Sequence, residues 1–117
     1  MNTEEIREFC LAKKGVEEAF PFDSDTLVFK VGGKIFLLMS ISSRPVSFNA
    51  KCNPDLAVEL REKYHFVRPG YHMNKKHWNT IETSGAVPRR LLQEWISHSY
   101  DLVLASLPKK LRQQLTS

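Results

Sequence analysis

The sequence predicts a single α+β domain in which helices pack against an antiparallel sheet. The chain has 117 residues, which fits one domain and leaves little room for a second. Hydrophobic residues make up 42% and charged residues 26%, values typical of globular proteins. Helical and strand patterns follow one another in the order α-β-β-β-α-β-β-α, so we expect one α+β domain over residues 1–117.

The first element is a predicted helix with Thr3 as its candidate N-cap. Apolar residues recur at helical spacing over residues 6–10 and form one stripe. Residues 16–25 follow and are interpreted as an ordered connection. We expect its two phenylalanines, Phe20 and Phe22, to fill the core rather than to bind a ligand.

Three strands come next. Thr26–Val31 alternates between apolar and other residues, and Lys34–Ser40 is so apolar that both of its faces are expected to be covered. Gly32 and Gly33 lie between them and are typical of a two-residue hairpin turn, where both positions adopt positive φ. Residues 46–49 form a short third strand.

The second half of the chain begins with a helix whose start is marked by Asn53, a strong capping residue, followed by a proline. Residues 66–67 and 77–82 are predicted as two further strands. A long helix is expected over residues 88–105, with one apolar side. Leucines within residues 111–115 indicate a short amphipathic turn at the tail.

Charge is distributed unevenly along the chain. Residues 1–25 hold seven acidic and three basic residues, a net charge of −4, whereas the rest hold 14 basic and six acidic residues, a net charge of +8. Residues 63–81 contain four basic residues and no acidic residue. This asymmetry indicates an anionic partner, and a solvated basic edge is the alternative interpretation.

Residues 68–80 combine cations, amides and aromatic side chains, as a nucleic-acid surface requires. Lys75 and Lys76 can meet phosphate oxygens, Asn74 can pair with a base edge or a phosphate, and aromatic rings can stack on bases. The alternative is structural. In that interpretation Trp78 belongs to the core, while Asn74 and a neighbouring histidine bond the backbone of a tight turn.

A metal site or a catalytic site would have to use the few histidines and cysteines. His72 and His77 have a spacing found in zinc sites, and Cys52 could add a thiolate or act as a nucleophile beside one of them. Two lysines lie between the histidines and would repel a cation. The chain has no nucleophile elbow, phosphate loop or dinucleotide fingerprint, so we expect no enzyme activity, metal or cofactor.

Six segments spread over nearly the whole chain form a distinctive set. They are residues 15–18, 34–36, 51–54, 67–80, 99–103 and 107–110, with the pattern His72-x-Asn74-Lys75-x-His77-Trp78 at the centre. This set resembles the MmcQ/YjbR family. The resemblance implies a small bacterial protein with a frataxin-like or secretion-chaperone-like α+β fold. It also implies a DNA-binding, double-wing assignment and brings no catalytic residue with it.

The chain departs from that pattern at one hairpin tip, where Gly32 and Gly33 carry no charge. Any phosphate contact there must come from a neighbouring lysine. The resulting hypothesis is a DNA-binding domain with weak or no sequence specificity. Phosphate contacts are assigned to Lys30, Lys34, Arg68, Lys75 and Lys76, and closer contacts to Tyr71, His72 and Asn74. The rival hypothesis is a protein-interaction module that docks an acidic protein surface.

The sequence also carries expectations about location. Its longest apolar run is Ile35–Met39, which is far too short to span a membrane. The first residues are acidic and form no apolar signal segment. The two cysteines form no CxxC pair, so we expect reduced thiols in a cytoplasmic protein.

Overall fold

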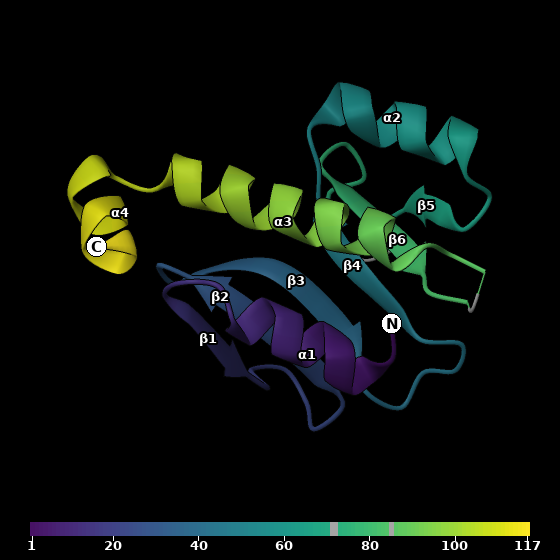
Figure 1. Ribbon diagram of the computed structural model, residues 1–117, viewed down its shortest axis with the longest axis horizontal. Helices are drawn as coiled ribbons and strands as arrows, with labels where there is room; N and C mark the ends of the chain where they lie inside the picture. The colour runs from purple at the N-terminus through teal and green to yellow at the C-terminus, as the bar shows by residue number, and fades with distance from the viewer. Residues whose placement is uncertain (71–72, 85) are drawn as a thin grey trace.

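The computed structural model describes residues 1–70, 73–84 and 86–117, and these form a six-stranded sheet with four helices (Figure 1). The helices are α1 (Thr3–Leu11), α2 (Pro54–Lys63), α3 (Arg89–Ser106) and α4 (Lys109–Thr116). The strands are β1 (Val16–Ala19), β2 (Thr26–Val31), β3 (Lys34–Ser40), β4 (Ser47–Lys51), β5 (Val67–Pro69) and β6 (Trp78–Glu82). Their order is β1-β2-β3-β4-β6-β5, and every neighbouring pair is antiparallel. The predicted α+β class is confirmed.

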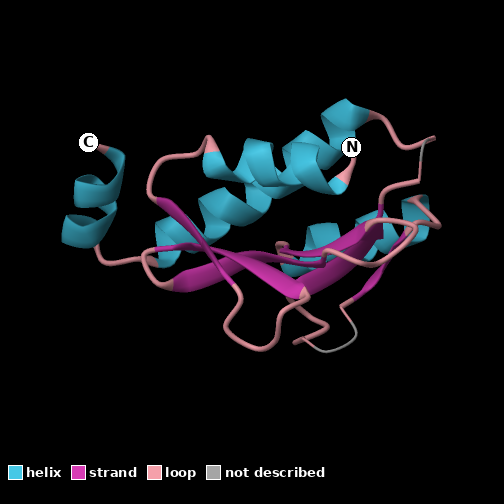
Figure 2. Ribbon diagram, turned by 90° about the horizontal axis from the view of Figure 1, so that it is seen from below, coloured by secondary structure: helices cyan, strands magenta, loops and turns pink. Residues whose placement is uncertain are grey.

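Helices α1 and α3 lie on one face of the sheet (Figure 2). The main core lies between them and the sheet, and Phe29, Phe36 and Phe48 are fully buried in it. Helix α2 packs beside α3 at the β5 end of the sheet, where the ring of Tyr64 lies 5.4 Å from that of Trp95. Most apolar area is therefore removed from water on this one face.

The opposite face is called the open face below. Strand registers place Ala19, Val28, Leu38, Asn49, Thr80 and Arg68 in one row across all six strands. Val28, Leu38 and Trp78 form a second buried apolar cluster, separate from the main core, against which Ile35 and Met73 pack. The expectation that Lys34–Ser40 is covered on both faces is confirmed, because its Leu37 belongs to the main core and its Leu38 to this cluster.

Two expectations for residues 16–25 are wrong. Val16–Ala19 is the edge strand β1, which pairs with β2. A strand of four residues is too short to show a recognisable alternation in the sequence. Phe20 and Phe22 do not fill the core, since their side chains are 48% and 65% exposed. The chain leaves the sheet after Ala19, and three other phenylalanines already occupy the core.

Helix boundaries follow capping side chains. Asn53 caps α2 as predicted, with its Oδ1 atom accepting the Asp55 amide at 3.0 Å. The cap of α1 is Asn2 rather than Thr3, because the Asn2 side chain accepts the Glu5 amide at 2.8 Å and the Glu5 carboxylate accepts the Asn2 amide in return. This reciprocal pair is a capping box. At the other terminus the expected short turn is a helix of eight residues, α4.

Candidate functional site

Five lysines gather at one end of the strands, which we call the basic end: Lys30, Lys34, Lys51, Lys75 and Lys76. Lys30 is the last but one residue of β2, and Lys34 begins β3 directly after the hairpin turn. Lys51 ends β4 opposite the first residue of β6, and Lys75 and Lys76 are exposed in the turn that leads into β6. The strand registers therefore place these residues, which are far apart in the sequence, at the same end of the sheet. Lys51 was not among the residues predicted for the site.

Arg68 differs from these lysines because it has an acidic partner. Its Nη2 atom lies 3.8 Å from a carboxylate oxygen of Glu82, and both side chains are partly exposed. Lys30 lies opposite Glu17 of β1 in register. Within the described chain no ion pair joins Lys30 to Glu17, and the ion pairs found there involve arginines only. The lysines therefore have the cationic groups that are most available to a phosphate.

The turn that carries Lys75 and Lys76 is closed by Asn74. The Oδ1 atom of Asn74 accepts the Lys76 amide at 3.0 Å. Its main-chain carbonyl accepts the amides of His77 and Trp78 at 3.1 and 3.0 Å. These contacts make Asn74 a turn-forming residue, as asparagine often is in loops. The structural alternative for Asn74 is supported, although its side chain is still exposed.

Arg61 of α2 contacts the backbone of this turn and was not among the residues predicted for the site. Its Nε atom donates to Oδ1 of Asn79 at 2.6 Å, and its Nη2 atom donates to the carbonyl of Trp78 at 3.2 Å and to that of Lys75. A planar guanidinium with several donors suits such a cluster of acceptors. The signal that could have found Arg61 is its place on the same face of α2 as the buried Ala57, one helical turn earlier.

The described part of the His72-x-Asn74-Lys75-x-His77-Trp78 pattern contains both buried and exposed side chains. Trp78 is 9% exposed and belongs to the open-face cluster, so the prediction that it is a core residue is confirmed. The amide of Cys52 donates to the His77 carbonyl at 2.7 Å, which ties the turn to the end of β4. Tyr71 and His72, both predicted to make close contacts, lie outside the described residues.

Cys52 is a poor candidate for a nucleophile. It is 5% exposed, and burial raises the pKa of its thiol to about 11, although the Arg61 charge acts in the opposite direction. The thiol is therefore protonated near pH 7, whereas nucleophilic attack and metal ligation need the thiolate. Burial likewise raises the pKa of Cys10 to about 12. Within residues 1–70, 73–84 and 86–117, no three metal-ligating side chains come together.

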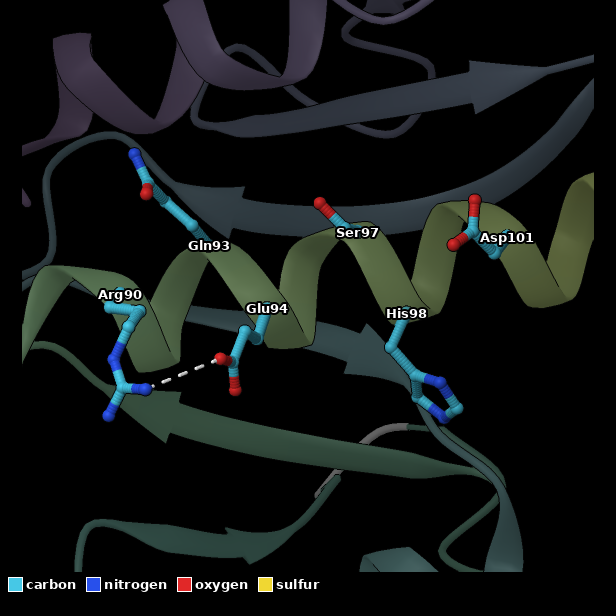
Figure 3. Close-up of a pocket in the computed structure, with 6 residues that line it drawn as sticks. All are labelled: Arg90, Gln93, Glu94, Ser97, His98 and Asp101. Carbon is cyan, nitrogen blue, oxygen red and sulfur yellow. Dashed lines mark ion pairs between the residues drawn. The ribbon is translucent and has the colours of Figure 1, made fainter.

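The exposed side of α3 forms a shallow depression with mixed charges. Figure 3 shows its lining residues, which are Arg90, Gln93, Glu94, Ser97, His98 and Asp101. Arg90 and Glu94 form an ion pair at 3.9 Å, and Lys13, two residues after the end of α1, donates to Ser97 Oγ at 2.8 Å. The Nε2 atom of His98 accepts the Asn53 amide at 3.2 Å. These contacts connect α3 to its neighbours, and His98 contacts the residue that caps α2.

Comparison with known proteins agrees with this fold. A family model described as YjbR matches residues 11–102. This chain belongs to the YjbR family. It is 38% identical over 108 residues to YbdF of Escherichia coli O157:H7, covering 92% of this chain and 88% of YbdF. It is 31% identical to YjbR of Escherichia coli strain K12, covering 98% of each chain.

Two solved structures resemble this member of the YjbR family. The Deinococcus radiodurans protein DR2400, with a domain described as DUF419, has a TM-score of 0.92 and 38% identity, covering 97% of this chain and 87% of DR2400. A Pseudomonas syringae protein has a TM-score of 0.76 and 25% identity, covering 88% of this chain and 99% of its own. YbdF and YjbR are both described as uncharacterized, so these relatives establish the family and the fold without an activity. Among the helices of the described ranges, none is long and apolar enough to span a bilayer.

Proposed function

We propose that this YjbR-family protein binds DNA through phosphate contacts made by the basic end, with little sequence discrimination. The observation that supports this most directly is the turn that presents Lys75 and Lys76. Both side chains are exposed, while Arg61 and Asn74 fix the backbone that carries them. Because the backbone of the turn is already ordered, binding neighbouring phosphates with these two cations does not require the loop itself to be ordered.

Weak sequence discrimination follows from how the other side chains of the turn are used. Base reading needs donors and acceptors that are free to reach a groove. The Oδ1 atom of Asn74 is bonded within the turn, Trp78 is buried, and the Arg68 guanidinium lies beside Glu82. The exposed groups that remain are mainly lysine ammonium groups, and these recognise phosphate charge rather than base identity.

Salt dependence is the first test. If Lys30, Lys34, Lys75 and Lys76 each contact one duplex phosphate, log K falls against log salt concentration with a slope of roughly −3.6. Fluorescence anisotropy of a labelled duplex measures this slope. We expect the double substitution Lys75→Glu and Lys76→Glu to abolish binding at moderate salt. Binding that is absent at low salt, or unchanged by this double substitution, would refute the proposal.

A matched control separates position from net charge. Arg44→Glu with Arg90→Glu changes the charge by the same amount at two exposed residues outside the basic end, one in the loop between β3 and β4 and one in the first turn of α3. We expect this control to weaken binding only slightly, through long-range screened repulsion. Equal losses in both double variants would mean that no particular surface is used. A nuclease-resistant protein partner that requires Lys75 and Lys76 would favour the acidic-protein alternative.

A further inference from the structure

A groove of about 420 Å³ runs along β3 on the open face. Leu38 and Ile35 lie at its floor, and Phe22 and Met73 flank it from two different loops. Helices α1 and α3 occupy the other side of the sheet (Figure 2). On the open face, Leu38 and Ile35 pack with the strand residues Val28 and Trp78 and with Met73. The volume of the groove falls within the range of small-molecule sites, and its lining is mostly apolar with a few polar groups.

One end of the groove is rich in acceptors. Thr26 and Ser40 line this end, and their hydroxyls donate to the carboxylates of Asp23 and Asp25 at 3.2 and 2.5 Å. Hydrogen bonds from neighbouring amides and hydroxyls lower the pKa of both carboxyls, so both carry negative charge at neutral pH. An anionic group is repelled from this end.

The other end of the groove lies at the basic end. Ile35 is the register partner of Lys30, so the Lys30 side chain starts beside the groove floor on the same face. Lys51 ends β4 on that face as well, since its neighbour Ala50 points into the main core. The groove therefore runs from carboxylates at one end, over an apolar middle, to lysines at the other end. Glu17 of β1 lies opposite Lys30 there, with no ion pair between them in the described residues, and Lys51 adds a second positive charge.

We propose that this groove binds a small amphipathic anion, with its apolar body over Leu38 and beside Phe22 and its anionic head at Lys30. The volume corresponds to roughly 14 non-hydrogen atoms at about 30 Å³ each, about the size of a ten-carbon carboxylate. This assignment explains why Phe22 is held 65% exposed at the mouth of a groove. It does not rest on the proposed DNA binding.

Decanoate, decanol and decyltrimethylammonium are the probes, because they share a chain and differ in the charge of the head. Isothermal titration calorimetry below the micellar range measures their affinities. We expect saturable binding of one decanoate per chain, about five- to tenfold weaker binding of decanol, and weaker binding still of the cation. Phe22→Ser should weaken all three, whereas Lys30→Gln should weaken decanoate and leave decanol unchanged.

Two control variants make the result specific. Phe20→Ser removes an exposed phenylalanine two residues away that does not line the groove, and Lys34→Gln removes a lysine at the hairpin turn. Both should bind decanoate like the wild type. No saturable decanoate binding, or equal losses in Phe20→Ser and Phe22→Ser, would refute the site. Equal affinity for decanol and decanoate would refute the anionic head. Binding of the DNA duplex is measured in a separate experiment, so failure of the groove proposal is distinguished from failure of the proposed DNA binding.

Discussion

Replacing Arg61 by methionine tests whether one side chain holds the basic turn. Methionine keeps much of the aliphatic stem and removes donors to Asn79, Trp78 and Lys75. Hydrogen bonds from a charged donor contribute about 1.5–3 kcal/mol each, but contacts that share one guanidinium are not additive. Asn79 is 1% exposed, so its Oδ1 atom would lose this partner while buried. We expect the free energy of unfolding to fall by about 2–4 kcal/mol.

Urea denaturation measures this loss, and an unchanged slope of free energy against urea would show that the unfolding transition itself is the same. Arg90→Met is the matched control, because Arg90 is exposed on α3 and forms only a long ion pair with Glu94. Its effect should stay within about 0.5 kcal/mol. Arg61→Lys should fall between the two, since an ammonium keeps the charge but not the planar set of donors.

A second measurement locates the effect in the turn. The amides of His77 and Trp78 are bonded to the Asn74 carbonyl, and they should exchange with solvent faster in Arg61→Met than in the wild type. Amides in the middle of β3 should change only in proportion to global stability. Suppose that the free energy of unfolding of Arg61→Met lies within about 0.5 kcal/mol of the wild-type value, and that its turn amides exchange at the wild-type rate. Arg61 then does not support the turn.

Three further predictions follow from single contacts. Ser99→Ala should destabilise the protein by about 1–3 kcal/mol in urea denaturation, because the buried hydroxyl accepts a β4 amide at 2.8 Å and donates to a β3 carbonyl at 2.5 Å; Ser97→Ala, which loses one lysine contact, should cost less. Gly32→Ala should lower the melting temperature more than Gly33→Ala. Both have positive φ, but a Cβ atom at Gly32 would lie 2.5 Å from a leucine at the end of α3, whereas Gly33 faces open space. Amide hydrogen bonds lower the pKa of Asp23 below its ordinary value of 3.8. The stability that ionised Asp23 contributes is therefore present above pH 3.8 and is lost as the pH falls through the lowered pKa of the folded protein. The free energy of unfolding of Asp23→Asn should fall less than that of the wild type between pH 7 and pH 2.

The parts of the fold that the sequence predicted correctly depend on local physics. Asn53 caps a helix with its own side chain, and the paired glycines at 32 and 33 allow the hairpin turn because both have positive φ. Long apolar periodicity marked α3 in the same way. In each case, the residues that determine the element lie within it or directly beside it in the sequence.

The errors and omissions depend on partners far away in the chain. Val16–Ala19 becomes a strand only because it can pair with the edge of β2, and Phe22 is exposed in a loop after β1, where it lines the open-face groove. Arg61 lies 18 residues before Asn79, so its role needs the packing of α2 beside β6. Lys51 lies at the same end of the sheet as the other lysines because of the order in which the strands pair. No periodicity in the sequence reports such distances.

The pattern His72-x-Asn74-Lys75-x-His77-Trp78 contributes to the architecture through several of its described residues. Asn74 closes the turn, Trp78 fills the open-face cluster, and the carbonyl of His77 ties the turn to β4. A chain that keeps these residues keeps the turn, whatever it binds, so family membership by itself carries the fold and not the partner. Any function of this turn must come from the groups that the turn leaves outward, and among the described residues the charged ones are Lys75 and Lys76.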